Sequence, residues 1–204
     1  MSASASGSGS TAPSTASDLR SATLDAAARL LAAEGPRGLT VRGVAAAAGC
    51  STIAVYHYFT DKQGLIDATY IEGHARLRAA QRAHQFTDDP EADVRNTCLV
   101  YREVALSHPD YFLVMFGHAV NALPRFEGEV RDTARDNYAA FIEVVRRWGE
   151  LTPLRTAPES AAYSLWAAGH GMVMLELTAN APRADLVIRY AETIDALMRG
   201  LRRG

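Results

Sequence analysis

From residue 18 onward, helix-start and helix-stop signals divide the sequence into segments whose apolar residues recur at helical spacing. In one of them, Thr40 stands at the capping position, and Val41, Val44, Ala45 and Ala48 follow at spacings of i, i+3, i+4 and i+7. No two segments show the alternating pattern and short turn of a β-hairpin. The sequence therefore predicts an all-α fold.

Prolines, glycines and capping residues mark the ends of about nine expected helices. Asp89-Pro90, for example, is a cap followed by proline in the first turn, where its missing N–H costs little. Residues 1–17 carry no charged side chain and, apart from Met1, no large apolar one, so we expect them to form a disordered tail. The helices are expected at about 18–34, 41–48, 51–59, 62–84, 90–107, a short stretch after 109, 124–148, 158–179 and 183–202.

Composition limits the class of protein. Apolar residues make up 48% and charged residues 22% of the chain, values typical of globular proteins. A net charge of −2 excludes a protein held on nucleic acid by overall positive charge, although a local contact surface remains compatible with it. Cys50 and Cys98 form no CxxC-type motif, which excludes a disulfide scaffold and fits a reducing compartment. With no apolar run of ~18 residues and no secretory signal, we expect a cytoplasmic protein without a membrane partner.

The stretch GCSTIAVYHYFTDK, residues 49–62, combines a turn glycine, hydroxyls, three aromatics, a histidine and a lysine. At 100° per residue, Val55 and Phe59 share a face that can pack on the preceding helices. The other faces suit the major groove of DNA, where hydroxyl and imidazole groups bond base edges and small apolar groups touch thymine methyls. These outward residues are Thr52, Ile53, Ala54, Tyr56 and His57. The alternative, a packing unit without DNA contact, leaves the exposed aromatics unexplained.

Tight turns join the first three expected helices, as in a helix-turn-helix. Gly49 suits the left-handed position after a helix, and Ser51 suits the cap of the next. Lys62 stands at the start of the fourth helix, where its ammonium group and the free N–H groups can seat a phosphate.

Over residues 24–66 the chain resembles the DNA-binding domain of the TetR (tetracycline-repressor-like) family. The segments LLAAEGPRGLTVRGVAAAAGCS and VYHYFTDKQGLI carry the resemblance, with Tyr56, Tyr58, Phe59, Lys62, Leu65 and Ile66 at the aromatic, lysine and apolar positions of the family. It implies phosphate contacts by Thr40, Tyr56 and Lys62, base contacts by Arg42, Thr52, Ala54 and His57, and a DNA-binding surface that also includes Ser51, Ile53 and Tyr58. The family often has a small residue and a hydroxyl residue where this chain has Ile53 and Ala54, so we expect its operator preference to depend on them.

A dimer is expected because charge is nearly balanced over residues 18–62, so one such domain would bind DNA weakly. Two recognition helices placed ~34–36 Å apart, one turn of DNA, would roughly double the contact free energy. The last helix offers an apolar seam for dimerisation, made of Val187, Tyr190, Ile194, Leu197 and Leu201. The preceding helix is rich in small residues, and its LWAAGHGMVML resembles a Trp-x-x-x-His-Gly pattern of one TetR subgroup. We expect a homodimer through the last two helices, as the resemblance also implies.

Aromatic and methionine residues are dense between residues 101 and 148, and pockets for small molecules are mostly apolar with a few polar groups. The candidate pocket residues are Tyr101, Phe112, Met115, Phe116, Tyr138, Phe141, His170 and Met174, with His118 as a further polar group. A packed core has the same composition, so the sequence leaves core and pocket open for each residue. For His170, four residues after Trp166, the spacing favours a hydrogen-bonded contact between helices over a ligand-binding role.

These observations predict a helix-turn-helix domain at 18–64 and a ligand-binding and dimerisation domain at 65–204. We expect a transcriptional repressor that leaves a palindromic DNA operator when a small-molecule effector binds. No acid–base pair, nucleophile or His-x-x-x-His spacing suggests an enzyme, a metal or a cofactor. An all-α enzyme and a protein-interaction module are the alternatives, and Cys50 is either a redox sensor or a small residue filling the turn.

Overall fold

The structure of the protein, a computed structural model, describes residues 16–83, 86–117, 128–178 and 185–203. The chain divides into two compact units, residues 1–69 and 70–204. The predicted tail lies outside the described residues except for its last two positions, which already belong to the first helix. The predicted helix starts at Pro124 and Arg183 also lie outside the described residues.

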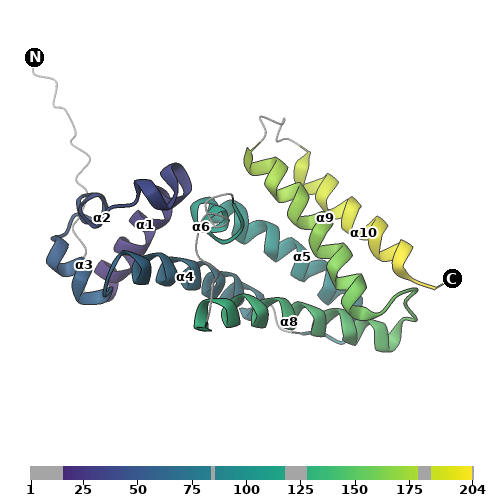
Figure 1. The fold of residues 1–204 in the computed structure, drawn as a ribbon. Helices are drawn as coiled ribbons and strands as arrows, with labels where there is room; N and C mark the ends of the chain where they lie inside the picture. Colours follow the sequence, from purple (N-terminus) through teal and green to yellow (C-terminus); the bar gives the residue numbers. More distant parts are fainter. Residues whose placement is uncertain (1–15, 84–85, 118–127, 179–184, 204) are drawn as a thin grey trace, which may run out of the picture. The chain divides into compact units, whose positions relative to one another are not determined.

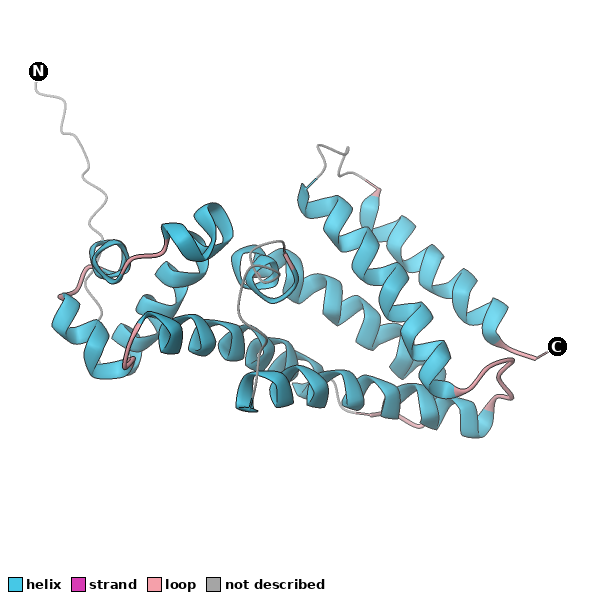
Figure 2. Cartoon of the chain, in the orientation of Figure 1, coloured by secondary structure: helices cyan, strands magenta, loops and turns pink. Residues whose placement is uncertain are grey.

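The described residues form nine α-helices and no β-strand (Figures 1 and 2), which confirms the predicted all-α class. Most of the predicted ends agree to within a few residues, because they rest on local caps. Asp89 Oδ1 accepts hydrogen bonds from the N–H groups of Glu91 and Ala92, as the Asp-Pro pair predicts. The helices are α1 (Ala16–Gly38), α2 (Val41–Ala48), α3 (Thr52–Tyr58), α4 (Lys62–Ala83), α5 (Pro90–Ser107), α6 (Pro109–Phe116), α8 (Gly128–Leu151), α9 (Pro158–Thr178) and α10 (Leu186–Leu201).

In the first unit, α1, α2 and α3 pack on one another around a small apolar core. Leu24, Leu31, Val44 and Val55 are at most 2% exposed. Full burial of each such side chain contributes about 1.5–3 kcal/mol relative to exposure. Phe59, just after α3, is also buried, so the predicted inward face of this helix is confirmed.

The buried face of α1 is wider than a single stripe. Counting along the helix suggests Leu19, Thr23, Ala26 and Leu30 as the inner residues, but Leu19 and Leu30 are only half-buried. The fully buried residues are Thr23, Leu24, Ala26, Ala27, Ala28 and Leu31. The reason is that α1 packs against two helices, α2 and α3, rather than one.

In the second unit, α5, α8, α9 and α10 form the main core, and α9 and α10 lie side by side (Figure 1). The largest fully buried side chains there are Trp148 of α8 and Tyr190 of α10. Arg102 of α5 makes a two-pronged ion pair with Glu176 of α9, and these side chains are 14% and 7% exposed. Charge-assisted pairs of this geometry are strong and specific, so this pair fixes α9 against α5.

The apolar seam of α10 does not form a free dimerisation surface. Tyr190, Ile194 and Leu201 are buried in the core of their own unit, and the Tyr190 hydroxyl donates to the Cys98 carbonyl at 2.9 Å. Helical spacing showed that one face of α10 is buried but not which partner covers it. Large apolar side chains that do remain exposed on α9 and α10 are Tyr163, Leu175, Val187 and Ile188.

Candidate nucleic-acid interface and ligand cavity

The turn between α2 and α3 follows the local signals in the sequence. Gly49 ends α2 with φ 67°, a left-handed conformation that glycine adopts without steric cost. Ser51 begins α3, and its Oγ accepts a hydrogen bond from Ala54 N at 3.1 Å. The half-buried Cys50 lies between them and is a free thiol. This turn sets the direction in which α3 leaves α2.

The outer face of α3 presents a mixed set of side chains to solvent. Ile53 is 80% exposed and Tyr56 is 55% exposed, and His57 is also exposed. Thr52 and Ala54 are half-buried beside them. Large exposed aromatic and aliphatic groups on a helix of seven residues indicate a contact surface rather than a solvated face.

Tyr58 differs from its neighbours on α3. Its hydroxyl donates to the carbonyl of Ala16 at 3.0 Å, at the start of α1, and its ring meets that of His57 edge-on with centroids 5.1 Å apart. Tyr58 therefore connects α3 to α1 and orients the His57 ring.

The polar candidates around α3 lie at helix starts. Thr40 caps α2, because its Oγ1 accepts from Gly43 N at 3.0 Å, and Arg42 follows it on the exposed side. Lys62 is the exposed first residue of α4, next to Asp61, whose Oδ1 accepts from Gly64 N at 2.8 Å. Since Asp61 already occupies that N–H group, the Lys62 ammonium is the main phosphate-binding group offered at this end of α4.

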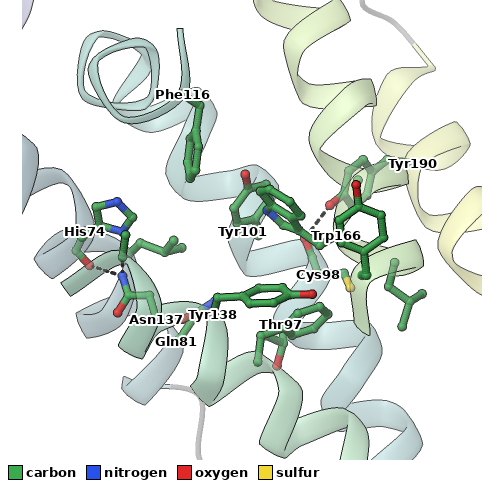
Figure 3. A pocket seen from close by; sticks show the side chains of 16 residues that line it. His74, Gln81, Thr97, Cys98, Tyr101, Phe116, Asn137, Tyr138, Trp166 and Tyr190 are labelled. Carbon is green, nitrogen blue, oxygen red and sulfur yellow. Dashed lines mark hydrogen bonds between the residues drawn. The ribbon is translucent and has the colours of Figure 1, made fainter. Parts of the chain in front are cut away.

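The second unit contains a cavity of ≈ 280 Å³ with almost entirely carbon walls (Figure 3). In the figure, Tyr138 lies across the middle, Trp166 and Tyr101 stand beside it, and His74 and Asn137 are together at one side. This volume lies just below the usual range for small-molecule sites, about 300–1,000 Å³. The lining residues are His74, Leu77 and Gln81 of α4, Thr97, Cys98 and Tyr101 of α5, Phe116 of α6, Ala134, Asn137, Tyr138 and Phe141 of α8, Tyr163, Leu165, Trp166 and Gly169 of α9, and Tyr190 of α10.

The predicted pocket residues divide into two groups. Those that line the cavity are Tyr101, Phe116, Tyr138 and Phe141. Phe112 and Met115 are buried beside a much smaller hollow, and Met174 packs against the core. His118 lies outside the described residues.

His170 acts as a contact between helices, behind the cavity wall. Its Nδ1 lies 2.9 Å from the Tyr101 hydroxyl, and its ring stacks at 5.5 Å and 37° on Trp166. Burial raises the pKa of Tyr101, so this phenol stays protonated. Burial also lowers the pKa of His170, which favours the neutral ring. The pair therefore holds two wall residues, Tyr101 and Trp166, in place.

His74 and Asn137 are polar lining residues that the sequence analysis did not select. Asn137 Nδ2 lies 2.9 Å from the His74 carbonyl oxygen and 3.0 Å from His74 Nδ1. Burial lowers the pKa of His74 to about 4, so its ring is neutral near pH 7. Among the described residues, His74 Nε2 and Asn137 Oδ1 have no hydrogen-bond partner.

Helical spacing contained a signal for both residues. His74 falls between the buried Tyr70 and Leu77, and Asn137 precedes the buried Phe141 by one turn. A histidine and an asparagine on inner helix faces need partners, so each pointed to a polar site in the core.

Cys98, a free cysteine on the cavity wall, is buried. Burial raises the pKa of the Cys98 thiol to about 12, which leaves it protonated and unreactive. Among residues 16–83, 86–117, 128–178 and 185–203, no three His, Cys, Asp or Glu side chains are grouped in a way that could hold a metal ion.

Comparison with known families agrees with this arrangement. Residues 24–69 match the model for bacterial regulatory proteins of the tetR family. Residues 94–201, more than half of the 204, match the tetracyclin repressor-like C-terminal domain. The chain belongs to the TetR family. The Trp-x-x-x-His-Gly subgroup stays a prediction, since neither match tests it.

Solved structures of similar fold cover nearly the whole chain of this TetR-family protein. A Rhodococcus protein of unknown function is 24% identical with a TM-score of 0.73, covering 91% of this chain and 96% of its own. A TetR family transcriptional regulator from Thermus thermophilus is 19% identical with a TM-score of 0.72, covering 89% and 99%. A structure described as the molecular basis for control of antibiotic production by bacterial hormones is 27% identical with a TM-score of 0.64, covering 90% and 97%. No curated protein gives a significant match to this sequence.

The family membership makes the chain a transcriptional regulator and confirms that part of the sequence prediction. Within the part of the chain that the structure describes, no helix is long and apolar enough to cross a membrane.

Proposed function

We propose that this TetR-family regulator is a ligand-responsive repressor, which binds a palindromic operator through α3 and leaves it when a small molecule enters the cavity. The observation that carries the proposal is the outer face of α3, where Ile53 is 80% and Tyr56 55% exposed beside His57. In a major groove such side chains gain contact area and hydrogen bonds. Their apolar parts are also removed from water, which is favourable.

Phosphate and base contacts have different places on this surface. Lys62 and Tyr56 project a charge and a phenol that suit phosphate oxygens and fix the position of the helix. His57, Thr52 and Ala54 lie on the face that meets base edges, and Ile53 can contact a thymine methyl group. Lys62 and Tyr56 would therefore supply affinity for any DNA sequence, and the residues facing the bases would supply sequence specificity.

A two-fold-symmetric operator requires two copies of the chain. The exposed apolar side chains of α9 and α10, Tyr163, Leu175, Val187 and Ile188, supply a surface suited to a second copy. Burying them in a dimer removes apolar area from water and places helices from both copies in one four-helix bundle. Of the predicted seam, Val187 stays in the proposed dimer contact, whereas Tyr190, Ile194 and Leu201 are buried within their own unit.

Ligand control would act through a shift between two conformations. The cavity walls include α4, which is one continuous helix from Lys62 to Ala83 and carries His74 and Leu77 on the wall. A ligand that prefers the conformation with weaker operator contact lowers operator affinity by the ratio of its own affinities for the two states. The similar structure described in terms of control by bacterial hormones is consistent with small-molecule control.

The test is selection of bound sites from random double-stranded DNA by the full-length protein, together with gel filtration. The proposal expects a dimer and an enriched site with two-fold symmetry and half-sites about one helical turn apart, ~34–36 Å. A pool that stays random at low salt would refute DNA recognition, and an enriched site without symmetry would refute the dimeric arrangement.

A further inference from the structure

The cavity excludes charged molecules. None of its described lining residues is Lys, Arg, Asp or Glu, and its one histidine, His74, is neutral near pH 7. A carboxylate or an ammonium group placed among these carbon walls would lose its hydration without gaining an opposite charge. The occupant that fits is therefore uncharged.

The aromatic walls favour a flat molecule. The Trp166 indole lies 5.6 Å from the Tyr138 ring and 6.4 Å from the Phe116 ring, centroid to centroid, at tilts of 56° and 57°. A planar ring system can stack or meet edges within such a set at the usual spacing of aromatic pairs.

Three polar groups of the wall are already occupied. The Tyr101 hydroxyl contacts His170, the Tyr190 hydroxyl donates to the Cys98 carbonyl, and Thr97 Oγ1 donates to the Asp93 carbonyl. Two buried polar atoms of residues that line the cavity, His74 Nε2 and Asn137 Oδ1, have no hydrogen-bond partner within the described residues.

The hydrogen bonds of Asn137 determine which nitrogen of His74 carries the proton. A carbonyl oxygen only accepts, so the Asn137 atom 2.9 Å from the His74 carbonyl is the amide nitrogen. The same nitrogen lies 3.0 Å from His74 Nδ1, and since both of its hydrogens are donated, Nδ1 must accept. In a neutral imidazole the proton then resides on Nε2, which makes Nε2 a fixed donor.

We propose that the cavity takes an uncharged, flat, mainly hydrocarbon molecule with a carbonyl oxygen that accepts a hydrogen bond from His74 Nε2. This assignment rests on the proposed function only in treating the cavity as the effector site. Nε2 has almost no exposed area, and the Phe116 ring, which shares the wall, lies edge-on to the imidazole at 5.9 Å. The Tyr70 ring packs on the imidazole as well, at 4.7 Å. A ligand reaches Nε2 when the aromatic rings around it shift, and the new bond satisfies a donor that is otherwise buried without a partner.

The test uses three naphthalene probes of nearly equal shape and isothermal titration calorimetry on the full-length protein without DNA. 2-Acetylnaphthalene carries the carbonyl oxygen, 2-isopropenylnaphthalene replaces that oxygen with a CH₂ group, and 2-naphthoate carries a negative charge. The expected order is the ketone tightest and the naphthoate weakest. Tighter binding of the naphthoate than of the ketone, or no heat with the ketone up to its solubility limit, would overturn the assignment.

The decisive quantity is the ratio of the two neutral affinities, because a general loss of packing weakens both probes alike. In His74→Phe the preference for the ketone over the alkene should fall by about tenfold, the effect of one buried hydrogen bond. His108→Phe is the matched control, since this half-buried histidine of the second unit does not line the cavity, and its ratio should equal that of the wild type. An unchanged ratio in His74→Phe would refute the role of Nε2.

A second measurement needs no variant. NMR of wild-type protein labelled with ¹⁵N in histidine should show His74 protonated on Nε2 and without a proton on Nδ1. The Nε2 signal should shift on addition of the ketone but not of the alkene. A proton on Nδ1 would contradict the assignment even if His74→Phe does not fold.

The outcomes separate this inference from the proposed function. Selective binding of the ketone without release of a selected operator would refute effector control and leave the cavity chemistry standing. Release of the operator by 2-naphthoate, with no ketone selectivity, would refute the cavity chemistry and leave the repressor function standing.

Discussion

Replacing Gly169 with alanine tests the packing of α9 against α10 at the cavity wall. A Cβ atom at this position would lie 2.6 Å from the Tyr190 hydroxyl oxygen and 3.4 Å from Cζ of the same ring. Tyr190 is 1% exposed and its hydroxyl donates to the Cys98 carbonyl at 2.9 Å, so the ring cannot shift without disturbing that bond. The substitution must therefore shift the ring and strain or break that hydrogen bond.

The magnitude follows from three contributions. Overpacking costs about 1–3 kcal/mol, and a buried polar group left without its partner costs about 1–3 kcal/mol. Alanine regains up to about 1 kcal/mol because it is a better helix former than glycine. We expect Gly169→Ala to lower the free energy of unfolding by about 3 kcal/mol, measured by urea denaturation at fixed protein concentration.

Two variants make this prediction specific. Gly200→Ala in α10, where an added Cβ meets nothing within 4 Å, should be neutral or stabilising by up to about 1 kcal/mol. Tyr190→Phe removes the clashing hydroxyl, so the double variant with Gly169→Ala should be at least about 1 kcal/mol more stable than the sum of the single effects. Strictly additive effects, or a Gly169→Ala protein as stable as the wild type, would refute the reasoning.

Three further expectations can be measured directly. Glu176→Gln should lower the free energy of unfolding by about 3 kcal/mol, because Arg102 keeps a largely buried charge without its partner; a change below about 0.5 kcal/mol in urea would count against the pair. The pKa of His74 is lowered to about 4 in the folded protein, against 6.5 when unfolded, so the stability it contributes above pH 6.5 is lost as the pH falls towards 4. Between pH 7 and 5, the free energy of unfolding in urea should therefore fall by about 2 kcal/mol more in the wild type than in His74→Phe. Equal losses in the two proteins would contradict this. In binding titrations, Tyr56→Phe should weaken all operator variants alike and His57→Ala chiefly one position, whereas equal losses on every variant would show that His57 reads no base.

The helix-turn-helix could be predicted from the sequence because its signals are local. Gly49, Ser51 and Thr40 act within three or four residues of their own position, so their conformations follow from short-range chemistry. The inward face of α3 could be predicted as well, because Val55 and Phe59 follow the helical period.

The cavity could be predicted only in part, because its wall combines six helices. Spacing along one helix shows which face is buried, but not which neighbour covers it. Met174 and Trp166 illustrate the limit, since both are large side chains of α9 and only Trp166 reaches the cavity. Tyr190 shows the same limit, since helical spacing suggested a dimer contact but the side chain is buried in the core of its own unit.

The most direct test of the central claim, that α3 and the start of α4 hold DNA, is the salt dependence of operator affinity. Fluorescence anisotropy should measure the dissociation constant of a selected operator across a series of salt concentrations for the wild type and for Lys62→Ala. With two copies of Lys62 on phosphate, the slope of log affinity against log salt should become shallower by about 2, at about 0.9 per phosphate. An unchanged affinity and slope would contradict the account.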